Sequence, residues 1–378
     1  MVQINDYYSY NRGDLPKGCQ MCVKGEKLVL FVTGACPRKC YFCPVSDQKY
    51  GADVSYANEK KVFSSKDVIA EAKLMSAKGA GITGGDPLAK IDRTVRYIKK
   101  LKEEFGPSFH IHLYTSLNLA SESNLQKLFQ AGLDEIRFHL DFESKQFYKN
   151  ILRASKFPWS IGIEVPSIPG KEKVLKKIID YIHDKVEFLN LNELEIADNE
   201  LSKLGEMGFK TKSKFSYAID GSLKCGFDAI KYVEDKGYNL KVHLCTAKLK
   251  DGVQLANRLI NESKGAKKKF DLVDDEGMLI RGAVYLKELA PGFSYRETLE
   301  KVDRESVLLK LNPIFDKIKS KLKLDDDDIF LDEKKLRVLI AKKNLKKLKT
   351  KEVAKGLMLA IVTEYPTDDQ LEMEVEFI

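Results

Sequence analysis

Strand and helix patterns alternate along most of residues 28–246, and this alternation limits the possible folds more than any other feature. Such regular alternation implies a parallel sheet covered by helices. We therefore expect an α/β chain with six or more strand–helix units. Apolar or alternating runs predict strands at 28–32, 81–84, 109–115, 134–142, 160–166, 187–195 and 240–246, with a shorter candidate at 215–219. Helices are expected near 64–78, 90–105, 121–131, 143–153, 171–185, 198–207 and 222–236.

Two of the predicted strands carry titratable side chains on one face. Alternate residues of a strand point to the same side of the sheet, so each of these strands has one apolar and one polar face. An open barrel packs its outer face on helices and lines a ligand cavity with the other, which predicts that the polar set faces the lumen. The alternative is that each histidine is a satisfied core residue. The polar set is His110, His112 and Tyr114 on one strand and Arg137, His139 and Asp141 on the next.

Length and composition fit a large domain with a smaller one attached. The chain has 378 residues, no apolar stretch of the roughly 20 residues that would cross a bilayer, and no signal-peptide pattern at its start. We expect a cytoplasmic protein without a membrane partner. Charged residues make up 32% of the chain, and their richness in Lys and Glu is typical of a thermophile.

Three cysteines follow the first predicted strand within one short loop. Cys36, Cys40 and Cys43 are spaced so that a folded loop can turn all three sulfurs toward one point, and thiolates are the ligands of iron–sulfur clusters. Three ligands leave one metal position open, as in a catalytic site. A zinc site completed from elsewhere is the main alternative. A disulfide loop would leave an odd thiol and suits a secreted chain.

The residues Cys36-x3-Cys40-x-Phe42-Cys43 resemble the CxxxCxΦC signature of the radical S-adenosylmethionine (radical SAM) superfamily, where Φ is aromatic. With the preceding Gly18-Cys19-x2-Cys22, the chain is similar to an archaeal-type group related to pyruvate formate-lyase activating enzyme. The resemblance implies a partial (β/α)6 barrel. It also implies a [4Fe-4S] cluster on the three cysteines, whose fourth iron binds S-adenosylmethionine for reductive cleavage to a 5′-deoxyadenosyl radical.

The same resemblance suggests which other residues bind the cofactor. Gly84-Gly85-Asp86 stands where the family has a GGE motif that binds the amino group of S-adenosylmethionine, with Asp86 in place of Glu. We expect this turn to lie at the barrel mouth beside the cysteine loop, because functional loops gather at that end. By position in the barrel, further contacts to adenine and ribose are expected from Phe42, Tyr114, Ser116 and Glu164.

A second cysteine pair, Cys19 and Cys22, precedes the first strand and is half of a possible metal site. Its other half is expected from His243 and Cys245 on the last strand, or from Cys225. Zinc or a second iron–sulfur cluster there would tie the N-terminal segment to the far edge of a barrel whose first and last strands approach each other. The alternative is that these are small buried hydrophobes and a core histidine.

Residues 267–378 break the strand–helix rhythm and predict a smaller α+β domain, after an N-terminal segment at 1–27 and a barrel at 28–266. A hairpin is expected around 270–281, a solvated loop at 325–328 and a half-buried strand at 371–378. Residues 334–351 carry nine Lys or Arg and no acid. Nucleic acid is a possible partner there, but a solvated helical face is favoured because the stretch lacks aromatic residues.

The expected partners are S-adenosylmethionine, an electron donor such as ferredoxin or flavodoxin, and a substrate of unknown class: a protein glycine, an RNA nucleotide, a peptide or a metabolite. A rival hypothesis is an iron–sulfur electron carrier or a cluster-stabilised nucleic-acid-binding module. That hypothesis requires a fourth protein ligand for the main cluster and no affinity for S-adenosylmethionine.

Overall fold

The computed structural model describes residues 3–378, which divide into two compact units. The first runs to Arg258 and the second is Leu259–Ile378. The division falls inside helix α9 (Ala256–Ala266), whereas the sequence pattern placed it after residue 266, at the end of that helix.

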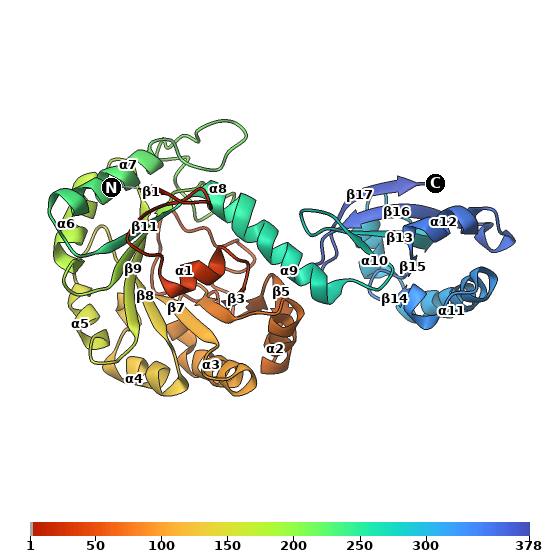
Figure 1. Cartoon of the computed structure of the whole chain (residues 1–378), viewed down its shortest axis with the longest axis horizontal. Coiled ribbons are helices and arrows are strands. Elements are labelled where there is room, and N and C mark those ends of the chain that lie inside the picture. The colour runs from red at the N-terminus through yellow and green to blue at the C-terminus, as the bar shows by residue number, and fades with distance from the viewer. Residues whose placement is uncertain (1–2) are drawn as a thin grey trace. The chain divides into compact units, whose positions relative to one another are not determined.

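The first unit is a parallel sheet with strand–helix alternation, as predicted (Figure 1). Each parallel strand pairs with the next along the path β3-β6-β7-β8-β9-β10-β11. This arrangement confirms the α/β class and the open barrel. The strands are β3 (Lys27–Phe31), β6 (Gly79–Thr83), β7 (His110–Ser116), β8 (Glu135–His139), β9 (Ser160–Ser167), β10 (Phe188–Glu193) and β11 (Lys241–Cys245).

Helices cover the outer face of this sheet, and one apolar core fills the space between them. Helix α2 begins at a capping box. The hydroxyl of Ser64 accepts from the N–H of Asp67, and the carboxylate of Asp67 accepts from the N–H of Ser64. The helices are α2 (Ser65–Leu74), α3 (Ile91–Phe105), α4 (Glu122–Ala131), α5 (Ile151–Ala154), α6 (Glu172–Ile182) and α7 (Ser222–Asp235). After β11, α8 (Ala247–Leu249) continues through a π-helical turn at Lys250–Leu255 into α9.

Antiparallel strands extend both edges of the parallel sheet. β4 (Ser55–Ala57) and β5 (Lys60–Val62) follow β3, and β1 (Gln3–Ile4) and β2 (Tyr10–Arg12) follow β11. Within residues 3–378, β3 and β11 therefore do not pair with each other. The N-terminal segment is joined to the last strand by backbone pairing of β2 with β11.

The segment between β10 and α7 differs from the prediction. Residues 198–207 form turns instead of a helix, and the strand expected at 215–219 is reduced to two isolated bridges, Glu195↔Ala218 and Thr211↔Ile219. The helical pattern is overridden because the side chain of Asn199 and the backbone N–H of Lys203 bond to the cysteine loop.

The second unit is α+β, as predicted. Its antiparallel sheet has the order β14-β15-β13-β16-β17, with β12 on β13. The predicted hairpin is confirmed as β12 (Leu272–Val273) and β13 (Leu279–Leu286). The remaining elements are α10 (Tyr295–Lys301), α11 (Arg304–Leu322), β14 (Ile329–Asp332), β15 (Arg337–Ile340), α12 (Lys342–Lys349), β16 (Leu357–Glu364) and β17 (Glu372–Phe377).

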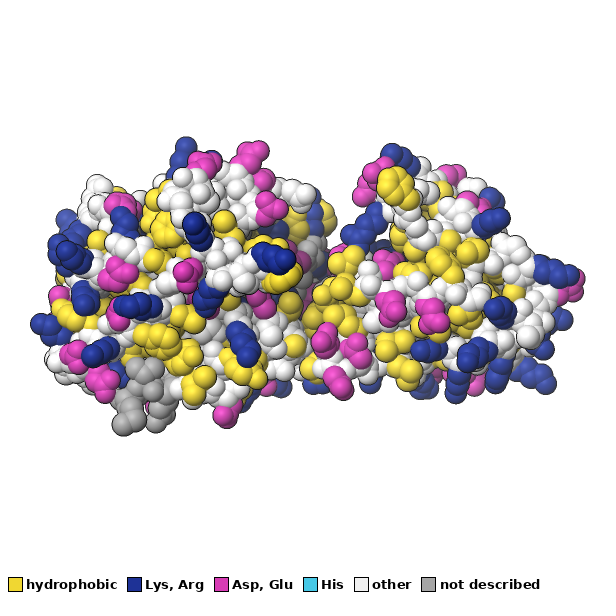
Figure 2. All heavy atoms as spheres, turned by 90° about the horizontal axis from the view of Figure 1, so that it is seen from above, with side chains coloured by type: hydrophobic (Ala, Val, Ile, Leu, Met, Phe, Trp, Pro, Cys, Tyr) yellow, Lys and Arg dark blue, Asp and Glu magenta, His cyan; other side chains and the backbone are white. Residues whose placement is uncertain are grey.

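The basic stretch at 334–351 is divided between a buried and an exposed part. Arg337 is buried against Asp332 and Glu364, and Lys335 is buried against Glu372. The lysines of α12 are exposed above its buried leucines. On the face seen in Figure 2, Lys and Arg side chains are scattered among acidic ones. Within residues 3–378, no helix is long and apolar enough to span a bilayer.

Candidate active site

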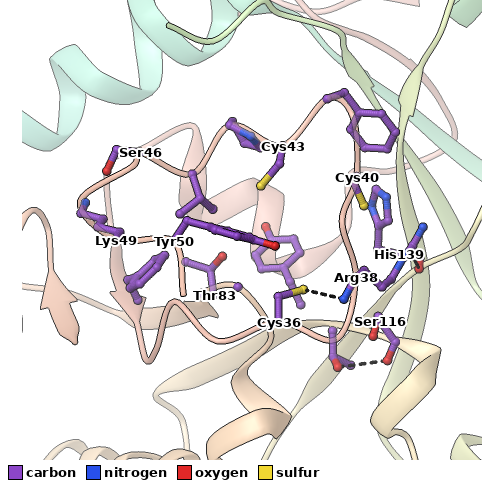
Figure 3. A pocket seen from close by; sticks show the side chains of 18 of the residues that line it. Cys36, Arg38, Cys40, Cys43, Ser46, Lys49, Tyr50, Thr83, Ser116 and His139 are labelled. Carbon is purple, nitrogen blue, oxygen red and sulfur yellow. Dashed lines mark hydrogen bonds between the residues drawn. The ribbon is translucent and has the colours of Figure 1, made fainter. Parts of the chain in front are cut away.

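The three loop cysteines border one cavity at the end of β3. Cys36, Cys40 and Cys43 are partly buried and, together with Gly84 and Gly85, line a space of about 630 Å³. Their sulfur atoms lie around this space in Figure 3. Burial raises the pKa of all three thiols, that of Cys36 to about 11, so in the free chain they are protonated and a bound metal would replace the protons. Three thiols on one cavity fit the demands of a cluster with an open iron.

Arg38 positions the cysteine loop from within. Its backbone N–H donates to Cys36 Sγ (3.4 Å), and its Nη1 donates to the carbonyl of His139 (2.9 Å) at the end of β8. Its Nη2 pairs with Asp141 at 3.3 Å. The loop is thus fastened across the barrel mouth. Spacing did not point to Arg38, because its partners lie about a hundred residues away in sequence.

The segment after β10 holds the same loop from the other side. Asn199 Nδ2 donates to the carbonyls of Cys43 (3.0 Å) and Val45 (2.9 Å), and the N–H of Lys203 donates to the carbonyl of Tyr41 (2.7 Å). These bonds explain why residues 198–207 are not helical, because the groups that hold the cysteine loop are directed away from a helical arrangement.

The turn Gly84-Gly85-Asp86 ends β6 beside the cysteine loop, where we expected it. The N–H of Gly85 donates to the carbonyl of Thr33 (2.7 Å), and that of Asp86 to the carbonyl of Ala35 (2.8 Å). A Cβ on Gly85 would lie 2.5 Å from the carbonyl oxygen of Gly34. Only glycine permits this close approach of the two loops.

The carboxylate of Asp86 accepts hydrogen bonds from neighbouring residues of the protein. It is 1% exposed and does not line the cavity. It accepts from the N–H of Leu88 (3.0 Å), the hydroxyl of Thr115 (2.7 Å), and both the hydroxyl (2.7 Å) and the N–H (3.1 Å) of Ser116. Asp86 and Ser116, both expected at the cofactor, therefore bind each other and fix the end of β7 to the glycine turn.

Phe42 lies between the cavity and the barrel interior. Its ring contacts Tyr41 edge-on (4.9 Å between centroids) and His139 at 5.7 Å. Burial and then the charge of Arg38 lower the pKa of His139 to about 4, so the imidazole is neutral. Neutral His139 and Phe42 present an uncharged wall, which suits the face of an aromatic base.

Behind this wall lies a second cavity of about 470 Å³, and of the predicted polar set Tyr114, Arg137 and His139 line it. His110 and His112 are buried and bonded to Lys27 and Tyr114, and Asp141 lies beyond the end of β8, where it pairs with Arg38.

Glu164 accepts from Arg137 Nη1 (2.8 Å), Asn190 Nδ2 (2.9 Å) and Asn192 Nδ2 (3.0 Å). Burial alone would raise the pKa of Glu164, but Arg137 and the two amides outweigh it and the pKa lies below its usual value. Tyr114, in turn, is bonded to His112 (3.0 Å) and Arg137 (3.2 Å). The cavities share Phe42, Tyr114 and His139 in their walls.

The residues expected at a second metal also meet at this second cavity. Cys19 and Cys22, one turn apart on helix α1 (Lys17–Cys22), line it with His243 and Cys245 of β11. His243 Nε2 is bonded to the hydroxyl of Ser9 (3.0 Å). Cys225 is elsewhere, in the apolar core, where its thiol donates to the carbonyl of Ile168 (3.5 Å).

Comparison with known proteins identifies the family. The model of the radical SAM superfamily matches residues 30–162. A protein of Methanocaldococcus jannaschii named "Putative glycyl-radical enzyme activating enzyme" is 37% identical over 98% of this chain and 95% of its own. Biotin synthase of Pseudoalteromonas translucida is 28% identical over 36% of this chain and 38% of its own. The chain belongs to the radical SAM superfamily.

Among solved structures, methylornithine synthase aligns with 13% identity over 62% of this chain and 79% of its own, at a TM-score of 0.37. The strand order above, rather than this alignment, defines the fold. Membership in the superfamily makes the protein an enzyme that uses a [4Fe-4S] cluster and S-adenosylmethionine. When bound, these supply reductive cleavage of S-adenosylmethionine and a 5′-deoxyadenosyl radical that takes hydrogen from a substrate.

Proposed function

We propose that Cys36, Cys40 and Cys43 hold the [4Fe-4S] cluster, and that the enzyme takes a hydrogen atom from a backbone glycine of a partner protein. The observation that carries the first part is the single cavity bordered by all three loop thiols and the glycine turn. The second part is supported by the relative named as an activating enzyme, which matches nearly the whole chain.

In this proposal, S-adenosylmethionine occupies the cavity beside the cysteines. The backbone of Gly84 and Gly85 would bind its amino group, while Phe42 and Tyr114 would line the adenosyl side. Asp86 and Ser116 act as positioning residues, because their polar atoms already bond to each other. Because the two cavities share part of their walls, S-adenosylmethionine bound there would lie next to the barrel interior.

The second cavity offers what an extended peptide segment needs. Backbone amides require both donors and acceptors along their path. Within residues 3–378, Asn190 Oδ1 has no partner and can accept, and the amide of Asn192 has a second N–H besides the one that bonds to Glu164. The segment at 194–221, which is fastened to the cysteine loop, carries exposed Met207 (53%), Phe215 (87%) and Tyr217 (67%). Exposed apolar side chains of this size are typical of a protein-binding surface.

The electron for cleavage is proposed to come from a small one-electron carrier such as ferredoxin or flavodoxin in a reducing cytoplasm. The chain has a formal net charge of +8, which would attract an acidic carrier and speed its approach.

A second candidate substrate is RNA, and one local feature favours it. Lys210, Lys212 and Lys214 alternate with other residues just before Phe215 and Tyr217, and Lys214 Nζ lies 4.9 Å from the centroid of the Phe215 ring. Interleaved lysines and exposed rings are suited to phosphates and stacked bases. We favour the protein substrate because the nearly full-length relative supports it.

The test uses anaerobically reconstituted, reduced enzyme with S-adenosylmethionine and extract of cells from which the chain derives. A protein substrate predicts that extract accelerates formation of 5′-deoxyadenosine, that protease but not ribonuclease removes this effect, and that a carbon-centred radical appears on a protein by electron paramagnetic resonance (EPR). Enzyme carrying Cys36→Ala is the control. Loss of the effect with ribonuclease alone would refute the protein substrate and favour RNA.

A further inference from the structure

Three thiols outside the cysteine loop border the second cavity. Cys19 is 6% exposed, Cys22 is partly buried and Cys245 is 9% exposed, and all three line the space. Helix α1 brings the first two there by packing against β3, β6 and β7 (Figure 1). They are three residues apart on the helix, so they project from neighbouring positions of one face.

Gly18 lets α1 approach the charged groups of the lumen. Its N–H donates to Glu135 Oε2 (3.3 Å), and a Cβ there would lie 2.5 Å from Arg137 Nη2. The helix that carries the cysteine pair is thus seated inside the barrel, not at its outer edge. The third thiol, Cys245, ends β11, the strand whose pairing with β2 joins the N-terminal segment to the sheet.

A cation lies in the wall beside the thiols. Arg137 lines the same cavity as Cys19, Cys22 and Cys245, and its Nη2 would lie 2.5 Å from a Cβ on Gly18, the neighbour of Cys19. Thiolates held here would therefore have a positive charge close by.

The wall beside the thiols contains polar atoms that lack partners. Within residues 3–378, neither Asn190 Oδ1 nor His243 Nδ1 has a hydrogen bond, although each side chain is 2% exposed and lines the cavity. The amide of Asn190 also donates to Cys19 Sγ (3.3 Å). A buried acceptor without a partner costs about 1–3 kcal/mol, which indicates that something polar normally occupies this wall.

We propose that Cys19, Cys22 and Cys245 bind a second four-iron cluster inside the barrel. Thiolates are the ligands that iron–sulfur clusters use, and three of them would leave one iron open toward the cavity. The substrate would then lie between this cluster and the wall of Phe42, Tyr114 and His139. The proposal does not depend on whether the substrate is a protein or RNA.

A cluster suits the site better than a single zinc ion. Ligands of one zinc must all lie about 2.3 Å from the same point, whereas the thiolates of a cluster bond to different irons and stand farther apart. Within residues 3–378, no three Cys, His, Asp or Glu side chains converge on one ion, and this includes the loop cysteines proposed for the first cluster. The bond from His243 Nε2 to Ser9 also holds one imidazole nitrogen away from metal.

The test measures iron, acid-labile sulfide and zinc after anaerobic reconstitution of the full chain. We expect about eight irons per wild-type chain and about four in Cys36→Ala/Cys40→Ala/Cys43→Ala. We also expect about four in Cys19→Ala/Cys22→Ala/Cys245→Ala, and about eight in the matched control Cys225→Ala. In the first triple variant, the EPR signal of the reduced cluster should not change when S-adenosylmethionine is added.

Each contrary result overturns the proposal. The first is that Cys36→Ala/Cys40→Ala/Cys43→Ala binds no iron, and the second is that this variant binds zinc alone. The third is that Cys19→Ala/Cys22→Ala/Cys245→Ala keeps about eight irons per chain. If that last variant fails to fold by circular dichroism, the loop-cysteine variant still decides the matter, because its proposed second site is intact. Iron content does not depend on substrate, so failure here would leave the proposed function standing.

Discussion

Replacing Asp86 by Ala tests whether this residue positions the cofactor loops. In the structure, four buried donors converge on its carboxylate, from Leu88, Thr115 and Ser116. Alanine leaves three of them without an acceptor, since the hydroxyl of Thr115 can still donate to the carbonyl of Ser116 (3.1 Å). At a net contribution of about 1 kcal/mol for each lost hydrogen bond, the free energy of unfolding of the first unit should fall by roughly 3 kcal/mol.

Asp86→Asn should cost less, about 1–2 kcal/mol. Its remaining oxygen can still accept from Leu88 and Thr115, and the hydroxyl of Ser116 can turn to accept from the new amide. Only the N–H of Ser116 then loses its partner. Both variants should weaken binding of S-adenosylmethionine, the alanine variant more, because the glycine turn is no longer fastened to β7.

Urea unfolding followed by tryptophan fluorescence is the assay, since Trp159 is the one tryptophan of the sequence and is buried in the first unit. The control is Asp92→Ala, which removes an acid that is 86% exposed. A loss of less than about 1 kcal/mol in Asp86→Ala, or unchanged cofactor affinity in stable protein, would refute the positioning role.

Three further predictions concern Asn199, Gly85 and Lys27. Asn199→Ala should release iron to a chelator several-fold faster than wild type. The control Asn124→Ala, which loses a similar side-chain bond on α4, should release iron at the wild-type rate. Equal release rates for the two variants would show that the segment after β10 does not hold the cysteine loop. Gly85→Ala should lower iron content as well as cofactor binding, because its Cβ would meet carbonyl oxygens of the cysteine loop, and normal iron content would contradict this. Burial lowers the pKa of Lys27 from 10.5 to about 7, so the folded chain loses this proton before the unfolded chain does. The contribution of Lys27 to the free energy of unfolding should therefore rise between pH 7 and 10.5. Lys27→Met should flatten the dependence of the free energy of unfolding on pH in this range. An unchanged pH dependence would contradict the lowered pKa of Lys27.

The sequence predicted the parts of the fold that depend on local pattern. The strand before Cys36, the alternation through β11 and the hairpin before β13 follow from hydrophobic period and turn residues. The inward direction of Tyr114 and Arg137 followed from strand alternation in the same way. These features need no knowledge of distant contacts.

The parts that were missed depend on contacts between distant residues. Residues 198–207 have a helical pattern but form turns, because Asn199 and Lys203 bond to the cysteine loop about 150 residues earlier. The pairing of β2 with β11 is equally invisible in local pattern. The bonds from the carboxylate of Asp86 to Thr115 and Ser116 on β7 are likewise not visible in its motif.

Reductive cleavage of S-adenosylmethionine by the reconstituted enzyme tests the central claim most directly. The account predicts that reduced wild-type protein forms 5′-deoxyadenosine and methionine, and that Cys36→Ala/Cys40→Ala/Cys43→Ala forms neither while keeping a wild-type circular dichroism spectrum. Cleavage by that triple variant at the wild-type rate would contradict the account.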